Sequence, residues 1–247
     1  MHNTRYTLIF TLVLTIVSAT ILSLLFFGTK DRADLAAKIF EKRAILSSVG
    51  TLLDKDVSQM TDQEVLDIFK NQVEQEAVDA QGNVVESAKI TQSGYNGGLP
   101  EDIEMAKERK KPEDQRIYPV YIFSANGEKV YILSVRGNGL WDEIWGNVAV
   151  KSDFNTIVGA SFDHKGETPG LGAEIKDNPA FSARFRGKEL YDNQGQYTSV
   201  AVVKGGVKDP DHQVDGISGA TITSNGVTEM LYRGLKEYEP FFNKEKG

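Results

Sequence analysis

The sequence predicts an α+β protein in which one N-terminal transmembrane helix is followed by a single domain with a mixed or antiparallel sheet and flanking helices. Three observations support this fold class. An uncharged apolar run occupies residues 6–27, and helix-like periodicity follows it. A series of β-rich runs comes next, before a last helical pattern near the C-terminus. Helices and strands therefore fall into separate blocks, which favours α+β over an alternating parallel sheet.

The apolar run is long enough to cross a membrane. Residues 6–27 contain no charge, Gly or Pro, and as a helix they span about 33 Å at ~1.5 Å per residue, against a hydrocarbon core of roughly 30 Å. The alternative is a cleaved signal peptide, whose apolar region is about 7–15 residues and follows a more basic segment than the single Arg5. We therefore predict a retained transmembrane anchor at 1–29 and a body at 30–247.

Composition excludes several classes of chemistry. The chain has 247 residues, with 28 basic and 35 acidic residues, three His and no Cys. Without Cys there is no disulfide framework, no thiolate metal site and no cysteine nucleophile, and three His argue against a multi-histidine metal site. Apart from the anchor, whose one charge is Arg5, the body carries 27 basic and 35 acidic residues. Such an acidic body gives no support for nucleic-acid binding.

Residues 30–115 are predicted to form the N-terminal, helical part of the body. The stretch 31–48 has apolar residues near a 3.6-residue period and continues the anchor as a helix. Thr61 and Glu64 have the spacing of a capping box before an apolar stripe, which predicts a second helix.

The rest of this part has weaker signals. Residues 76–100 are polar and Gly-rich, which indicates strand fragments and loop. A short charged helix is expected at 101–111, and its basic cluster is most simply a solvated face. The cluster comprises Lys107, Arg109, Lys110 and Lys111.

Residues 116–247 are predicted to form the core of the domain. The β-rich runs 120–123 and 130–135 flank Asn126-Gly127, a strong hairpin signal. A C-terminal helix is expected from Thr223 to about Tyr238. Further β-like runs are at 148–150, 156–162 and 198–203, and the buried face of the C-terminal helix is expected to comprise Val227, Met230, Leu231 and Leu235.

Two glycine-rich segments have the composition of binding loops. Gly137–Trp141 combines glycines with a Leu–Trp pair that suits contact with a flat apolar group. Taken alone, however, it is more simply a hairpin end whose Trp fills the core. His164–Gly172 follows a predicted strand, and its glycines permit close backbone approach to a ligand. The simpler interpretation is an elaborate surface turn with an ordinary histidine.

A third segment, Asp215–Asn225, places small and hydroxyl residues just before the C-terminal helix. Thr223 or Ser224 is a good N-cap, and a helix N-terminus favours an anion such as phosphate. A hydrolase with Ser218 or Thr221 as nucleophile is an alternative. It would need a base, and the surrounding sequence lacks the Gly-x-Ser-x-Gly context.

The segments Gly139–Trp141, Glu167–Gly172 and Ser218–Thr221 occur in this order behind one anchor. Together they resemble the NqrC family of the sodium-translocating NADH:quinone oxidoreductases, and they are similar to the RnfG family of the related Rnf electron-transport complexes. Asp215-x-x-Ser-Gly-Ala-Thr221 looks like the flavin-transferase recognition motif, whose terminal Thr carries FMN through a phosphoester bond in this family. Residues 43–115 carry little of the resemblance.

The resemblance implies roles for individual residues. Thr221 would carry FMN covalently, Asp215 would serve the attaching enzyme, and Leu140, Trp141 and Leu171 would line the isoalloxazine. The other expected FMN contacts are Glu167, Thr168, Gly170, Gly172, Lys204, Ser218, Gly219, Ala220 and Thr223. No catalytic side chain and no metal site are expected in this chain.

The function expected from the resemblance is electron relay by a membrane-anchored FMN protein in a sodium-pumping complex, with NADH oxidised in another subunit. Expected partners are the other subunits, the lipid bilayer and a periplasmic flavin transferase. Alternatives are an RnfG-type electron carrier and a cofactor-free sensor or scaffold domain. Five Lys or Arg at 30–43 against Arg5 place the body in the cytoplasm by the positive-inside rule, whereas the resemblance places it in the periplasm, at the bacterial inner membrane.

Overall fold

The computed structural model describes residues 4–125 and 127–246, which form two compact units, Met1–Glu41 and Lys42–Gly247. In the first unit the described residues belong to helix α1 (Thr4–Ser47), whose apolar side chains are exposed from Tyr6 to Phe27. Its most apolar 18-residue stretch has a mean hydropathy of 2.5, so α1 is long and apolar enough to cross a membrane. The hydroxyls of Thr11, Thr15 and Thr20 donate to carbonyls one turn earlier, which satisfies these polar groups within the helix.

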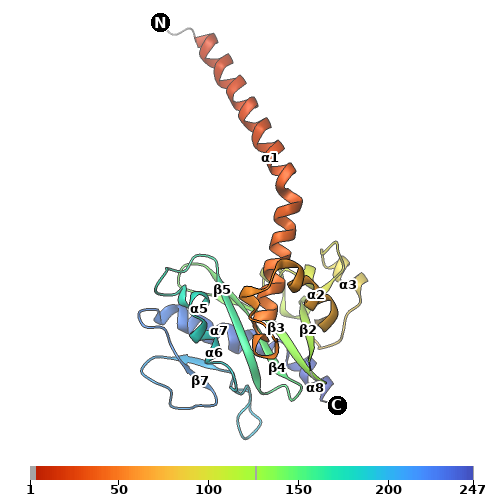
Figure 1. The fold of residues 1–247 in the computed structure, drawn as a ribbon, viewed down its shortest axis with the longest axis vertical. Coiled ribbons are helices and arrows are strands. Elements are labelled where there is room, and N and C mark those ends of the chain that lie inside the picture. Colours follow the sequence, from red (N-terminus) through yellow and green to blue (C-terminus); the bar gives the residue numbers. More distant parts are fainter. Residues whose placement is uncertain (1–3, 126, 247) are drawn as a thin grey trace. The chain divides into compact units, whose positions relative to one another are not determined.

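The second unit is built on a five-stranded antiparallel sheet whose strands neighbour one another in chain order (Figure 1). The strands are β1 (Val73–Asp79), β2 (Ile117–Ala125), β3 (Glu128–Asn138), β4 (Glu143–Lys151) and β5 (Ile157–His164), and a separate parallel pair comprises β6 (Ala201–Val203) and β7 (Gln213–Asp215). Ala125 pairs with Glu128, so the predicted hairpin is confirmed, with Gly127 at a φ of 83°. Asn126 lies outside the described residues.

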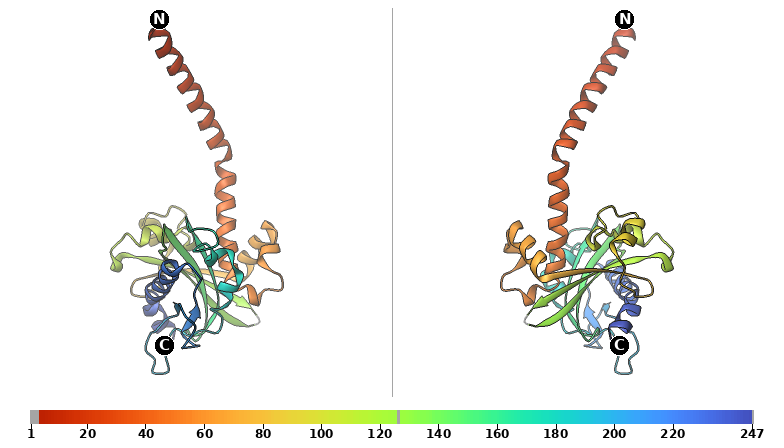
Figure 2. Two further views of the ribbon diagram at one scale, coloured as in Figure 1. Left: turned by 90° about the vertical axis from the view of Figure 1, so that its left-hand side faces the viewer. Right: turned by 90° about the vertical axis from the view of Figure 1, so that its right-hand side faces the viewer.

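Helices cover both faces of this sheet (Figure 2). The α-helices of the second unit after α1 are α2 (Asp62–Gln72), α3 (Ser87–Gln92), α4 (Met105–Glu108), α5 (Glu174–Asp177), α6 (Pro179–Ala183), α7 (Thr221–Lys236) and α8 (Glu239–Glu245). Short 3-10 turns are η1 (Gly50–Leu52), η2 (Val57–Gln59), η3 (Pro100–Asp102) and η4 (Glu113–Gln115). Helix α2 starts with the predicted capping box, in which Thr61 and Glu64 bond each other's backbone N–H.

The run at the centre of β2 is buried on both sides, which explains its lack of polar alternation. Val120 and Ile122 belong to the main core beneath α7, while Tyr121 packs edge-on against Phe69 of α2, with ring centroids 5.9 Å apart. Helix α7 packs on β3 with the predicted residues buried: Val227, Met230, Leu231 and Leu235.

Glycines allow α7 to lie close against the end of β3. A Cβ on Gly226 would clash with the carbonyl oxygen of Asn138, and one on Gly137 would stand 2.6 Å from Cβ of Met230. Any larger residue would force the helix away from the strand. This packing fixes the N-terminus of α7 beside the loop that follows β3.

Two local expectations were wrong. Strand fragments and loop were expected at 76–100, but the edge strand β1 begins earlier, at Val73, and the helix α3 lies inside that segment, so the segment 30–115 contributes to the sheet as well as helices. The alternation of apolar and polar residues in β1 is obscure because the polar run 74–76 follows Val73 and the strand lies at the edge of the sheet. The helix expected at 101–111 reduces to α4, because residues 100–102 form the 3-10 turn η3 and the residues that follow it, 103–104, are extended.

Candidate functional site

The three segments singled out in the sequence meet at the N-terminus of α7, and the carboxylate of Glu167 joins them. The backbone N–H of Trp141 donates to Glu167 Oε1 at 3.0 Å, and the Thr223 hydroxyl donates to Oε2 at 2.6 Å. Glu167 and Thr223 are buried. One carboxylate therefore holds the β3–β4 loop against the first turn of α7, and we call this arrangement the Glu167 bracket.

Small residues make room for the bracket. A Cβ on Gly139 would clash with Glu167 Oε1, and one on Gly172 would clash with Oε2. These two glycines are therefore required for the carboxylate to reach both partners. The indole N–H of Trp141 also donates to Thr168 Oγ1 at 3.1 Å, a second link between the two loops.

A salt bridge adds a third link between these loops. Lys165 Nζ lies 3.1 Å from Asp142 Oδ2, and the N–H of Glu143 donates to Asp142 at 2.8 Å. The backbone hydrogen bond and the lysine lower the pKa of Asp142. The charge of Asp142 thus helps to hold the two loops together.

Thr221 is the first residue of α7, and its side chain is exposed. The helix starts two residues earlier than predicted, with Ala220 as N-cap and no side-chain cap. Thr223 is not the cap because its hydroxyl bonds Glu167. The first N–H to bond within the helix is that of Ser224, to the carbonyl of Ala220, so the preceding N–H groups have no intrahelical acceptor. An anion on Thr221 would therefore lie at the positive end of the helix.

Thr221 also lines a pocket of about 360 Å³. Lys204, Asp215 and Ser218 line the same pocket, so the structure brings together residues that the sequence places up to 17 positions apart. Lys204 is the cation among them and it is exposed. Asp215 is held through its backbone, whose carbonyl accepts from Arg184 Nη1 at 2.6 Å. The pocket suits a phosphate ester of Thr221, with an ammonium group nearby.

Exposed apolar side chains gather at the same site. Trp141 is 69% exposed, and Leu140 and Leu171 are also exposed, so the alternative in which Trp141 fills the core is wrong. Leu171 approaches the Ser218–Thr221 turn, since a Cβ on Gly219 would lie 2.7 Å from Leu171 Cδ2. Gly219 and Gly170 both have positive φ, at 77° and 72°. Sequence reasoning missed Ile222, which is exposed although it is apolar and follows Thr221 directly.

The two described histidines serve as structural acceptors or donors. His164 Nδ1 accepts the backbone N–H of Glu167 at 3.1 Å, and His212 Nδ1 lies 2.8 Å from the carbonyl of Glu189. Within the described residues, neither histidine is hydrogen-bonded to Ser218 or Thr221. The described geometry therefore supplies no histidine base for the hydrolase alternative.

The FMN-binding domain family matches residues 139–236, a range that starts at the β3–β4 loop and contains every predicted site residue. Fold and site thus define an FMN-binding domain carried by a chain with one long apolar helix.

The match to known proteins extends over nearly the whole chain. It is 34% identical to the NqrC-type subunit of the Na(+)-translocating NADH-quinone reductase of Neisseria meningitidis, over 97% of this chain and 93% of the relative. To the equivalent reductase subunit of Pseudomonas aeruginosa it is 35% identical, over 94% and 91%. The chain belongs to the NqrC family of the Na(+)-translocating NADH-quinone reductases, and is thus a subunit of an oxidoreductase complex.

Solved structures agree with this assignment. The crystal structure of the corresponding reductase subunit from Parabacteroides distasonis superposes with a TM-score of 0.73 at 35% identity, covering 86% of this chain and 96% of that one. NqrC of Shewanella oneidensis gives a TM-score of 0.67 at 31% identity, over 85% and 99%. The predicted fold class and the resemblance to the NqrC family are both confirmed.

Proposed function

We propose that this chain relays electrons through one FMN that is bound covalently by a phosphoester at Thr221. The observation that carries the proposal is the hydroxyl of Thr221, which is exposed, stands at the N-terminus of a 16-residue helix and lines a pocket with Lys204. A phosphate there gains the free N–H groups of the first turn, the helix dipole and a nearby ammonium group.

The apolar side of the site suits the ring of the flavin. Trp141 and Leu171 offer exposed apolar surface, and the Trp141–Thr168 hydrogen bond holds the indole in place. When bound, the flavin supplies the electron-transfer chemistry, since its ring accepts and donates electrons. The protein positions the ring and leaves part of it accessible to a redox partner. Leu140 completes the apolar surface on the same loop.

An intact mass spectrum tests the proposal directly. Native expression together with a flavin transferase is expected to add one FMN less one water to the chain, because a phosphoester forms with loss of water. Expression without the transferase is expected to give the unmodified mass and a colourless protein. A yellow product without transferase would contradict the attachment route, and an unmodified mass with it would contradict covalent FMN.

Trp141→Ala is expected to change the flavin environment without preventing attachment. The substitution removes an exposed indole and its bond to Thr168, while the buried core is untouched. We expect a shifted absorption spectrum and a changed midpoint potential in a protein that still carries covalent FMN. Val84→Ala, at an exposed apolar position outside the site, is the control. An unchanged spectrum and potential in Trp141→Ala would remove Trp141 from the flavin site.

We further propose that residues 1–29 anchor the chain in the bilayer and that the body, 30–247, lies in the periplasm, where a flavin transferase modifies it. The family resemblance supports this orientation against the count of basic residues. Because the chain has no Cys, a single Lys208→Cys in the exposed 204–211 loop gives an unambiguous label. An impermeant maleimide is expected to label it in intact spheroplasts. Protection until the membrane is opened would place the body in the cytoplasm.

A further inference from the structure

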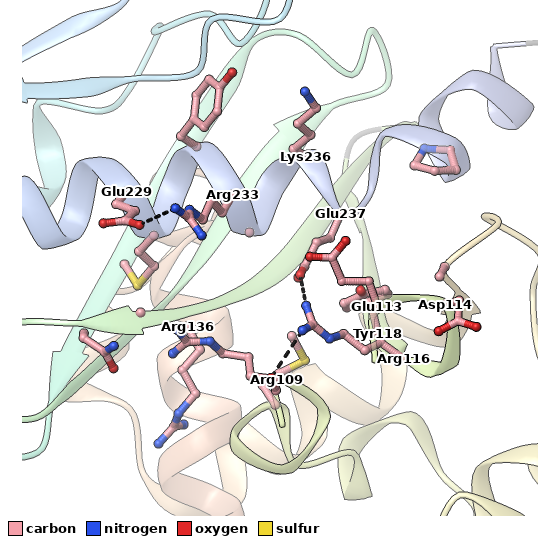
Figure 3. Close-up of a pocket in the computed structure, with 18 of the residues that line it drawn as sticks. Arg109, Glu113, Asp114, Arg116, Tyr118, Arg136, Glu229, Arg233, Lys236 and Glu237 are labelled. Atoms are coloured by element: carbon pink, nitrogen blue, oxygen red, sulfur yellow. Dashed lines mark hydrogen bonds and ion pairs between the residues drawn. The ribbon is translucent and has the colours of Figure 1, made fainter. Parts of the chain in front are cut away.

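A second and larger pocket lies along α7, away from Thr221. It has a volume of about 700 Å³ and runs between α7, the end of β3 and the segment from α4 to β2 (Figure 3). Its apolar lining includes the buried Met230 and Tyr118, and its rim is charged. From Gly226 to Glu237 it follows α7 for about 16 Å at ~1.5 Å per residue. We call it the α7 groove.

The residue types in the α7 groove are those that protein interfaces prefer. The chain contains nine Arg and four Met, of which four Arg and two Met line this groove together with two Tyr. Arg, Met and Tyr are enriched in protein interfaces, whereas the Lys, Glu and Asp side chains that also line the groove are of depleted types. The groove residues of these types are Arg109, Arg116, Arg136, Arg233, Met105, Met230, Tyr118 and Tyr232.

Several of the charges in the groove are paired within the domain. Arg116 Nη1 lies 2.5 Å from Glu237 Oε1, and Arg233 Nη2 lies 2.9 Å from Glu229 Oε1 (Figure 3). Burial raises the pKa of Glu237, and Arg116 opposes that rise. Arg136 pairs with Glu143 outside the groove at 2.7 Å. These pairs hold the rim of the groove in place. Other cations of the groove are not part of them and can bind the carboxylates of a partner.

Two cations in the groove form no salt bridge with a carboxylate among the residues that the structure describes. The carbonyl of Arg109 accepts from Arg116 Nη2 at 3.3 Å, and the positive charge of Arg109 helps to oppose the rise in the pKa of Glu237. Lys236 lies over the rings of Tyr197 and Tyr232, 6.0 and 5.9 Å from their centroids. Sequence reasoning assigned Arg109 to a solvated face, but the side chain is half-buried and lines the groove. A guanidinium in such a position is suited to bind a carboxylate.

The groove adjoins the flavin site. Asn138 lines it, and the next residue begins the loop that carries Trp141. Gly226 of α7 packs on the carbonyl of Asn138 at that end. A segment bound in the groove would therefore stand beside the loop that faces the flavin.

We propose that the α7 groove docks an acidic segment of another subunit of the reductase, with Arg109 and Lys236 binding its carboxylates. The body carries 27 basic and 35 acidic residues, whereas five basic and four acidic side chains line the groove. A member of a multi-protein complex needs such a surface outside its anchor, and charge complementarity sets which partner docks and how fast. The docking proposal does not depend on the proposed flavin site. Only its consequence, that docking aids electron exchange, rests on that site.

Charge reversal in the assembled complex tests the proposal. Arg109→Glu with Lys236→Glu is expected to reduce quinone reduction at least tenfold and to weaken retention of this chain during purification, while covalent flavin, read by in-gel fluorescence, stays at the wild-type level. Lys110→Glu with Lys208→Glu adds the same charge at exposed positions outside the groove and is expected to behave as wild type. Equal behaviour of the two double variants would overturn the proposal.

A cross-link keeps the proposal testable if charge reversal prevents folding. A photoreactive phenylalanine analogue replaces Tyr232, which is 43% exposed at the groove, in the otherwise unchanged complex. We expect a cross-link to an Asp- or Glu-rich segment of another subunit, and none from the exposed control position Val84. The docking proposal would be overturned if Tyr232 cross-linked only to lipid or to a second copy of this chain, or if no cross-link formed. Loss of flavin in every version would instead count against the proposed function.

Discussion

Thr221→Ala is expected to abolish covalent flavin and to leave the fold intact. Thr221 is exposed, its side chain caps nothing, and Ala is well tolerated at the first position of a helix. We therefore expect the free energy of unfolding to change by less than about 0.5 kcal/mol, as for most surface substitutions. In-gel fluorescence and intact mass report attachment, and chemical denaturation reports stability.

Thr221→Ser is the matched control, because it keeps a hydroxyl at the same place and is expected to keep some covalent flavin. Covalent flavin retained in Thr221→Ala would mean attachment elsewhere. Thr223 is a poor substitute, since its hydroxyl is buried and bonded to Glu167. Attachment there would require the Glu167 bracket to open.

Glu167→Ala is expected to lower the free energy of unfolding by about 3 kcal/mol, because two donors lose a charged acceptor and the buried Thr223 hydroxyl is left unsatisfied. The protein expressed without transferase is used, so the measurement does not depend on FMN. Glu167→Gln fills nearly the same volume but replaces one acceptor by a donor. We expect it to lower the free energy of unfolding by less than Glu167→Ala does.

Glu167→Ala is also expected to change the structure of the flavin site. Without the Glu167 bracket the β3–β4 loop is freed from α7, so we expect the tryptophan fluorescence, to which Trp141 contributes, to change more in Glu167→Ala than in a control variant. Glu104→Ala, which removes an exposed carboxylate paired with Lys107, is that control and is expected to be nearly neutral. Unfolding of Glu167→Ala at the wild-type denaturant concentration would contradict the role given to the bracket.

What the sequence predicted correctly depends on neighbouring residues. Local patterns of a few residues predict three features correctly. These are the capping box of Thr61 and Glu64, the hairpin that Gly127 helps to close and the buried face of α7. The resemblance rested on three short motifs that occur in a fixed order behind one anchor, and the family comparisons confirm it.

What the sequence did not predict depends on distant contacts. Thr223 looks like an N-cap, but Glu167, 56 residues away, takes its hydroxyl, and α7 therefore starts at Thr221. The exposure of Trp141 likewise follows from bonds to Glu167 and Thr168 in another loop. Arg109 sits in a charged run that looks solvated, and only the packing of α4 beside β3 brings it to the α7 groove.

The order of the strands has a consequence for how the chain matures. The five strands pair in chain order and are complete at His164, but α7, which covers β3, is made only with residues 221–236. Until then the face bearing Val120 carries short helices such as α5 and α6, whose Ile175 and Phe181 belong to the same core, but it lacks α7, and Thr221 has no helix N-terminus. A modifying enzyme that reads the 215–221 segment in its folded form would meet it only on a finished domain, so flavin attachment would act as a checkpoint on folding.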